Sequence, residues 1–302
     1  MLTNRTLYGD CRETLKELPE KCINTCITSP PYWGLRDYQE EDQLGMEDTP
    51  EEFVENLVNV FREVKRVLRD DGTVWLNLGD SYSSGGRATT TNQSLRGDKD
   101  YGVTRPKPSK GIKPKDLIGI PWRVAFALQA DGWYLRQDII WHKPNPMPES
   151  VQDRCTKAHE YIFLLSKNEK YFYDNEAIKE NVLTNDNTNR DRDNSKLNNT
   201  PGRSRMAGLK TNNYTKKNKR SVWTVTTKPF KGAHFATFPP DLIEPMILAG
   251  CIKGGVVLDP FMGSGTTGLV AQELGRRWIG CELNPEYINL QKNRTAQQVL
   301  EL

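Results

Sequence analysis

The 302-residue sequence predicts an α/β fold: a Rossmann-like, mostly parallel sheet with helices on both faces. Two stretches predict it. After Thr49 an amphipathic helical pattern leads into an apolar strand, which is the crossover unit of a parallel sheet. Near the end of the chain, residues 263–268 place three glycines between an apolar strand and a helix, as in the βαβ units of doubly wound sheets.

The first elements lead to a proline-rich stretch. Residues 12–18 predict a short helix, and residues 23–28 predict a buried strand. The run Thr28-Ser29-Pro30-Pro31-Tyr32-Trp33 should end that strand, because proline cannot donate to a sheet ladder. Free proline carbonyls beside an aromatic ring suit a planar base with an exocyclic amino group. The alternative interpretation is a strand-ending turn with buried aromatics.

The next helix has a clear start signal. Thr49-Pro50-Glu51-Glu52 forms a capping box with proline at the first helical position, and apolar residues follow at helical spacing. We expect this helix to end near residues 70–72. An apolar strand over residues 73–78 follows, and Gly79 to Ser81 should lie at the carboxyl edge of the sheet, where open α/β folds bind ligands.

The middle of the chain predicts a helix over residues 121–130 and two strands over 135–143 and 160–166. The first strand ends at Lys143, and three prolines within residues 144–148 break it. Lys143 is therefore a candidate for a phosphate contact, or simply a solvated strand end.

Positive charge gathers in two polar stretches. Residues 85–117 carry eight Lys or Arg against three Asp, and residues 184–220 carry ten against three, although the formal net charge of the chain is only +3. Neither stretch has the apolar periodicity of a folded core. Two such runs favour contacts with phosphates, and linkers are the alternative.

The last quarter reads as a second βαβ unit. Residues 221–227 predict an extended stretch, residues 241–250 a helix, residues 256–258 a strand, and residues 278–281 another strand after the glycine loop and its helix. Glu282 follows Gly263 by 19 positions, near the ~20 expected for an acid that binds a ribose. A nicotinamide cofactor would fit this motif too, whereas the absence of Gly-Lys-Ser/Thr argues against a nucleoside triphosphate.

Two motifs resemble those of the DNA amino-methyltransferases that use S-adenosylmethionine. Ser29-Pro30-Pro31-Tyr32 resembles their catalytic tetrapeptide, and Phe261-Met262-Gly263-Ser264-Gly265 resembles their cofactor loop. The catalytic motif comes first, which resembles the permuted beta group. The resemblance implies the class I methyltransferase fold, S-adenosylmethionine as cofactor, double-stranded DNA as partner and flipping of the target base. Ser at the first motif position accompanies N4-cytosine methylation in this family, and Asp accompanies N6-adenine methylation.

The resemblance also implies roles for individual residues. The expected catalytic residues are Ser29, Pro30, Pro31 and Tyr32. The expected cofactor-binding residues are Asp10, Cys11, Phe235, Thr237, Phe238, Asp259, Pro260, Phe261, Gly263, Ser264, Gly265, Thr266, Thr267, Glu282, Leu283 and Asn284. Asp10 could instead cap the helix that follows it. The expected DNA-binding residues are Trp33, Lys143, Arg203, Arg205, Lys107 and Lys110.

We expect one methyltransferase domain in three parts. Residues 1–183 form the catalytic half with the basic insert 85–117, residues 184–220 form a target-recognition insert, and residues 221–302 form the cofactor-binding half. The first insert, rich in Lys, Gly and Pro, should grip the DNA backbone, while Asn and Arg in the second suit base edges.

Several wider expectations follow from composition. Six unclustered cysteines and the absence of a long apolar run suggest a reduced cytoplasmic protein of a prokaryote or phage, with no membrane segment. Three scattered histidines argue against a metal site. We expect a monomer or homodimer, with a cognate restriction endonuclease as a functional partner. The alternatives are N6-adenine methylation, RNA as substrate, and a non-catalytic DNA- and cofactor-binding protein.

Overall fold

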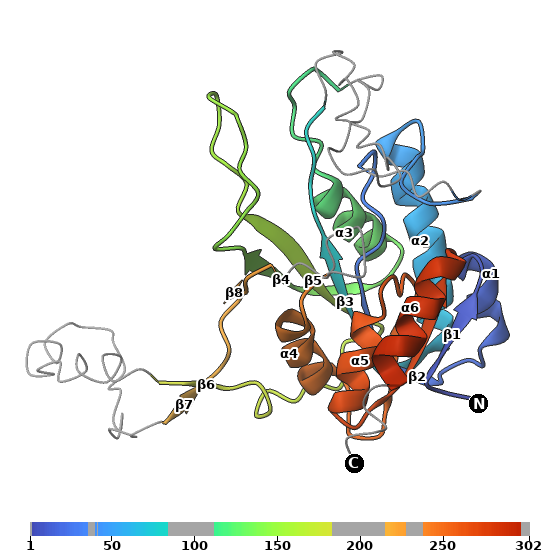
Figure 1. Ribbon diagram of the computed structural model, residues 1–302. Coiled ribbons are helices and arrows are strands. Elements are labelled where there is room, and N and C mark those ends of the chain that lie inside the picture. Colours follow the sequence, from blue (N-terminus) through green and yellow to red (C-terminus); the bar gives the residue numbers. More distant parts are fainter. Residues whose placement is uncertain are drawn as a thin grey trace, which may run out of the picture.

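The computed structural model describes residues 2–35, 40, 42–83, 112–182, 215–227 and 238–296. Its main feature is an eight-stranded sheet with the order β1-β10-β9-β2-β3-β5-β4-β8 (Figure 1). Every neighbouring pair is parallel except those that involve β5, which runs antiparallel to both β3 and β4. The predicted mostly parallel α/β sheet is therefore confirmed.

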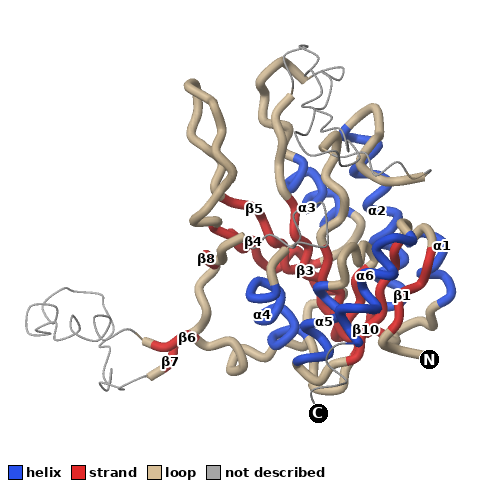
Figure 2. Tube along the Cα trace, in the orientation of Figure 1, coloured by secondary structure: helices blue, strands red, loops and turns tan. Residues whose placement is uncertain are grey.

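The elements agree closely with the sequence pattern. The sheet consists of β1 (Arg5–Tyr8), β2 (Ile23–Thr28), β3 (Leu68–Leu78), β4 (Tyr134–His142), β5 (His159–Ser166), β8 (Val222–Thr224), β9 (Val256–Asp259) and β10 (Arg277–Glu282). The helices are α1 (Cys11–Thr14), α2 (Pro50–Val67), α3 (Ile120–Ala130), α4 (Pro240–Gly250), α5 (Thr266–Glu273) and α6 (Pro285–Ala296), with a 3₁₀ turn at Leu15–Glu17. A separate pair, β6 (Glu180–Asn181) and β7 (Lys216–Lys217), lies apart from the main sheet (Figure 2).

Two hydrophobic cores cover the two faces of the sheet. One joins α1, α2 and α3 to one face, through residues such as Phe53, Phe61 and Leu128. The other packs α4 and α5 on the opposite face, through residues such as Met246 and Val270. Helix α6 packs against α5, β1 and β10. Helices thus cover both faces, and the strand ends stay accessible at the edges of the sheet.

The junction between α2 and β3 differs from the expectation. The capping box of Thr49 and Glu52 starts α2 as predicted, but β3 begins at Leu68 without an intervening turn. Residues 69–71 form an irregularity inside the strand, and the pairing with β2 shifts register there. Leu68 is completely buried, and a Cβ on Gly72 would lie only 2.5 Å from its Cγ. With Leu68 buried, the strand begins before residues 70–72, where the helix was expected to end.

The carboxyl ends of β1, β2, β3, β9 and β10 meet at one edge of the sheet, because these strands run parallel. Pairing of β2 with β9 joins the first and last parts of the chain in one sheet. Most of the two basic inserts lies outside the described residues. None of the helices in the described part of the chain is long and apolar enough to cross a bilayer.

Candidate active site

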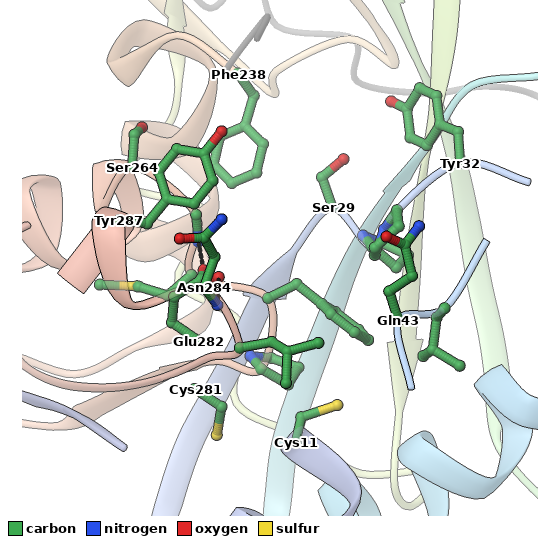
Figure 3. Close-up of a pocket in the computed structure, with 18 of the residues that line it drawn as sticks. Cys11, Ser29, Tyr32, Gln43, Phe238, Ser264, Cys281, Glu282, Asn284 and Tyr287 are labelled. Atoms are coloured by element: carbon green, nitrogen blue, oxygen red, sulfur yellow. Dashed lines mark hydrogen bonds between the residues drawn. The ribbon is translucent and has the colours of Figure 1, made fainter. Parts of the chain in front are cut away.

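A cavity of about 320 Å³ opens at this carboxyl edge. Figure 3 shows its two sides: Phe238, Ser264, Glu282, Asn284 and Tyr287 gather on one, while Tyr32 and Gln43 lie on the other. Ser29, at the end of β2, lies between them. For brevity we name these the glycine-loop side and the Tyr32 side.

Sixteen of the residues predicted from sequence line this cavity. They are Asp10, Cys11, Ser29, Pro30, Pro31, Tyr32, Lys143, Phe238, Pro260, Phe261, Gly263, Ser264, Thr266, Glu282, Leu283 and Asn284. The predicted catalytic motif and most of the predicted cofactor loop therefore share one cavity, although they lie at opposite ends of the chain.

Glu282 is the main polar group of the glycine-loop side. It ends β10, and its carboxylate accepts hydrogen bonds from the backbone N–H of Gly263 at 2.6 Å and of Asn284 at 2.9 Å. Burial raises the pKa of Glu282 to about 7, although these backbone donors act in the opposite direction. A carboxylate has about four acceptor positions, so it can still accept hydroxyl donors from a ligand.

The glycine loop is held from behind by α6. The Gln291 side chain donates to the carbonyl of Gly263 at 2.6 Å, and Arg294 donates to the carbonyl of Ser264 at 2.9 Å and to its hydroxyl at 3.0 Å. Gly265 does not line the cavity: it has φ +84°, and a Cβ there would lie 2.8 Å from Cγ of Gln291. This glycine allows the close packing of α6 on the loop, and its predicted cofactor contact stays a prediction.

Asp259 is buried behind the cavity in this structure, and its predicted cofactor contact stays a prediction. Asp259 is only 1% exposed and does not line the cavity. Its carboxylate accepts from the hydroxyls of Thr28 and Thr267, each at 2.6 Å, and from the backbone N–H of Phe261 at 3.1 Å. The same contact takes Thr267 away from the cavity. Asp259 is therefore an internal link between β2, β9 and α5.

Asp10 and Cys11 form the wall near the end of β1. Asp10 caps α1 by accepting from the backbone N–H of Arg12 at 2.8 Å, and it also pairs with the Arg12 side chain. Asp10 thus caps the helix, as the alternative interpretation held, and it also lines the cavity, so its cofactor contact stays a prediction. Burial raises the pKa of the Cys11 thiol well above its ordinary value, so it contributes a neutral surface.

On the Tyr32 side, the aromatic ring is fixed at both ends. A Cβ on Gly79 would lie 2.5 Å from Cε2 of Tyr32, so the ring packs directly against the backbone at the end of β3. The Tyr32 hydroxyl donates to Glu160 at 2.7 Å. The ring is therefore held in place beside Ser29.

Glu160 connects three elements on this side. Besides Tyr32, it accepts from the side-chain amide of Asn77 at 3.1 Å and forms a close ion pair with Lys143. The Lys143 ammonium lies 4.2 Å from the ring centroid of Trp141. Lys143 is thus not a solvated strand end, because its side chain is only 18% exposed and forms part of the cavity wall. Its DNA contact stays a prediction.

Trp33, which the sequence predicts to contact DNA, is buried in this structure, and its DNA contact stays a prediction. Trp33 is 4% exposed, belongs to the core beneath the cavity, and donates its indole N–H to the carbonyl of Glu47 at 2.9 Å. This position agrees with the alternative interpretation, in which the aromatics of this stretch are buried. A buried Trp usually finds a partner for its indole N–H, as Trp33 does here. Six other predicted site residues lie outside the described part of the chain, and their roles stay predictions: Phe235, Thr237, Lys107, Lys110, Arg203 and Arg205.

Sequence reasoning missed several residues that line the cavity, including Gln43, Asn77, Trp141, Glu160 and Tyr287. Asn77 lies two residues before Gly79 in a strand whose carboxyl end was expected at the site, so its polarity inside an apolar run was a usable signal. Among the residues that the structure describes, no group of three or more His, Cys, Asp or Glu could hold a metal ion.

Comparison with known families and curated proteins gives consistent results. A family model described as DNA methylase matches residues 23–293. The Type II methyltransferase M.SmaI of Serratia marcescens is 50% identical over 297 residues, covering 97% of this chain and 91% of that protein. The Type II methyltransferase M.Cfr9I of Citrobacter freundii is 49% identical over 294 residues, covering 97% of this chain and 88% of that protein.

Solved structures share the fold. The PvuII DNA methyltransferase, named as cytosine-N4-specific, aligns with a TM-score of 0.64 at 21% identity and covers 97% of this chain and 88% of its own. A protein of Thermus thermophilus described as a DNA modification methylase, solved with S-adenosyl-L-methionine, aligns with a TM-score of 0.60 at 25% identity. That alignment covers 99% of this chain and 95% of the Thermus chain.

Proposed function

The chain belongs to the DNA methylase family that its residues 23–293 match, and we propose that it transfers a methyl group to N4 of cytosine in duplex DNA. The family uses S-adenosylmethionine, and the 49–50% identical relatives are Type II methyltransferases. Membership of the family makes the chain an S-adenosylmethionine-dependent DNA methyltransferase, whereas the base and the roles of individual residues are the proposal.

The residues on the glycine-loop side fit the cofactor. We assign the ribose hydroxyls to Glu282, whose carboxylate keeps acceptor capacity although two backbone N–H groups already bind it. Phe238, Phe261 and Tyr287 supply apolar and aromatic surface in the same cavity. Gly263 and Ser264 bring backbone close to the methionine end. When bound, S-adenosylmethionine supplies an electrophilic methyl group on a sulfonium.

On the Tyr32 side of the cavity, side chains and backbone of this chain bind and orient the base. Tyr32 stacks on the flipped ring, and its fixed position determines the plane in which the base lies. The Ser29 hydroxyl and the Pro30 carbonyl accept the two hydrogens of the exocyclic amino group. These contacts draw the lone pair of the amino nitrogen out of conjugation with the ring and direct it across Ser29 toward the glycine-loop side. Ser29 is a weak base, so the proton leaves after methyl transfer, and alignment supplies most of the rate.

The choice of cytosine depends on one observation: Ser29 occupies the first position of the tetrapeptide and lies between the two sides of the cavity (Figure 3). In the resembled family, Ser at this position accompanies N4-cytosine methylation. A neutral hydroxyl can accept a hydrogen from the amino group of either base, so the chemistry of Ser29 alone does not dictate the base. N6-adenine methylation is therefore the alternative, because adenine offers a similar amino group.

The test is to methylate mixed-sequence duplex DNA and to digest the product to nucleosides. We expect N4-methylcytosine, and its loss in Ser29→Ala and Tyr32→Ala proteins. N6-methyladenine without N4-methylcytosine would refute the choice of base. Wild-type activity in both variants would refute the assigned site residues. Sequencing methylated positions in expressing cells gives the target site, and we expect a cognate endonuclease for that site.

A further inference from the structure

Glu160 has an unusual environment for a carboxylate in a cavity wall. Its side chain is 15% exposed, and three donors converge on it: the Tyr32 hydroxyl at 2.7 Å, the Asn77 amide at 3.1 Å and the ammonium of Lys143. These groups come from three separate places, namely the turn after β2, the end of β3, and the segment after β4. Glu160 therefore determines where both Tyr32 and Lys143 lie.

Stability alone does not account for this ion pair. Removing two charges from water costs about as much as their attraction returns, and apolar residues of similar size are often as stable. The pair joins the residue that follows β4 to the start of β5, at the edge of the sheet where the cavity opens. Its position in the cavity wall, with Trp141 on one side and Tyr32 on the other, favours a role in binding.

The donor capacity of Lys143 indicates what it binds. An ammonium has three N–H donors, and one of them is directed at Glu160. A base that stacks on Tyr32 with its amino group at Ser29 presents a ring nitrogen acceptor beside the amino-bearing carbon. This atom is N3 in cytosine and N1 in adenine, and it needs a donor. Ionised Glu160 can only accept, whereas Lys143 lines the same side of the cavity and can donate.

We propose that Lys143 donates a hydrogen bond to the ring nitrogen next to the target amino group, and that Glu160 is the positioning residue that holds Lys143 and Tyr32 for this contact. The inference rests on the proposed function of the cavity, but not on the choice of cytosine. The contact orients the base in its own plane, while Tyr32 defines that plane. Together they direct the amino nitrogen at the methyl donor.

The test uses a duplex with the target site in which the ring nitrogen of the target base is replaced by C–H, 3-deazacytosine for cytosine. A hydrogen bond from a charged donor to that nitrogen predicts that the wild-type kcat/KM falls roughly tenfold or more on the analogue. Lys143→Met keeps the stem over Trp141 but has no donor. This variant should be slower on the natural duplex and should lose no further activity on the analogue.

The positioning role of Glu160 is tested by a measurement that a purely structural role would not change. Glu160→Gln keeps the shape and one acceptor oxygen, so we expect cofactor affinity and melting temperature near wild type but a reduced difference between natural and analogue duplexes. Glu160→Ala should remove this difference. Lys21→Met is the matched control, because Lys21 forms a similar 2.8 Å pair with Asp70 that is more than half exposed and lies at the opposite edge of the sheet.

Two results would overturn the inference. One is that the wild-type enzyme methylates the natural and the analogue duplex equally fast. This measurement does not depend on whether any variant folds. The other is a folded Lys143→Met enzyme with the wild-type preference for the natural base. If the product nucleoside is N6-methyladenine, the cytosine proposal fails, and the same comparison with 1-deazaadenine still decides the role of Lys143.

Discussion

Glu282 and Asp259 are buried carboxyl groups at the ends of neighbouring strands, but their surroundings give them different roles. Burial raises both pKa values, that of Glu282 to about 7 and that of Asp259 to about 6. The oxygens of Asp259 accept from Thr28, Thr267 and a backbone amide, and the residue does not reach the cavity. Glu282 lines the cavity. Only Glu282 can therefore couple its ionisation to a ligand.

This coupling predicts how cofactor affinity depends on pH. Ribose hydroxyls donate to the ionised form of Glu282, so binding lowers its pKa and releases a proton. Affinity should rise with pH up to about 7 and level off above it. With that pKa, the dissociation constant should be roughly tenfold weaker at pH 6 than at pH 8.

Calorimetric titration across this pH range tests the prediction, with Glu282→Gln as the control. The variant should bind more weakly at pH 8, and its affinity should lose the component that titrates near pH 7. An unchanged pH dependence in Glu282→Gln would assign the titration to another group, such as the amino group of the cofactor.

A second prediction at the scale of one residue concerns Gly79. An added Cβ would lie 2.5 Å from the Tyr32 ring, so Gly79→Ala must displace that ring. Turnover should fall roughly tenfold or more, because small misplacement of a reacting group costs up to about 100-fold in rate. Cofactor affinity should stay near wild type, since the contact lies on the Tyr32 side. In a Tyr32→Ala background, Gly79→Ala should cost no further activity; an additive loss would contradict the steric explanation.

The sequence identified the residues that follow the strands expected to end at the site, such as Ser29 and Glu282. It missed Glu160 because β5 is antiparallel, so the amino end of this strand, not its carboxyl end, lies at the site edge. A rule based on the carboxyl ends of strands cannot find such a residue. It could not place Asp259 and Trp33 for another reason: adjacency to a motif does not show that these two side chains are buried.

At the scale of elements, Asp259 links β9 to β2 and α5. Asp259→Ala would leave the hydroxyls of Thr28 and Thr267 buried without this acceptor. We expect a loss of about 2–4 kcal/mol in the free energy of unfolding, from two buried hydrogen bonds of about 1–3 kcal/mol each and partial relaxation. Urea unfolding at pH 5 without cofactor measures it, because the carboxyl is mostly protonated there and the cost of burying its charge is small.

The pH dependence of the free energy of unfolding distinguishes the effect of the Asp259 carboxyl from that of simple packing. A pKa raised from 3.8 to about 6 means that ionised Asp259 destabilises the fold relative to the protonated group. Its contribution is therefore most favourable at acid pH and declines as pH rises toward 6. Asp259→Asn should remove this decline. If Asp259→Asn and wild type change stability in parallel between pH 4 and pH 7, the carboxyl is not buried as described.

Element boundaries were the most predictable part of the fold. Strand β2 and the capped start of α2 agree with the sequence pattern, because apolar runs, prolines and a capping box are local signals. The start of β3 did not follow from a local signal: Leu68 pairs with Ile23 in the neighbouring strand and is buried, so the strand begins five residues before the expected Thr73. The antiparallel direction of β5 is likewise a tertiary property.

At the scale of the whole molecule, the two ends of the chain build one site because β9 and β10 lie beside β2 and β1 in a continuous sheet. Ser29 and the glycine loop must approach each other within one cavity, and pairing of β2 with β9 enforces this. The order of motifs in the sequence is then irrelevant to the chemistry, since only the strand order brings the groups together.

In the proposed function the cavity takes a cofactor and one flipped base, so we expect sequence choice to come from elsewhere in the chain. We propose that residues 85–117 grip the DNA backbone and that residues 184–220 carry most of the sequence choice, on the basis of Lys, Gly and Pro in the first and Asn, Thr and Arg in the second. Replacing Lys107, Lys110 and Lys113 with Ala should weaken binding to all duplexes alike. It should lower the salt slope by roughly one unit for each phosphate interaction that the substitution removes.

Replacing Arg203 and Arg205 with Ala should instead reduce the preference for the target duplex, by about 1–3 kcal/mol for each arginine that reads a base. Binding of both sets of variants to target and non-target duplexes across a salt series separates the two effects, because phosphate contacts change the slope and base contacts change the ratio. The division is wrong if the arginine pair weakens both duplexes equally while the lysine set alters their ratio. Unchanged binding in both sets would mean that neither stretch contacts DNA through these side chains.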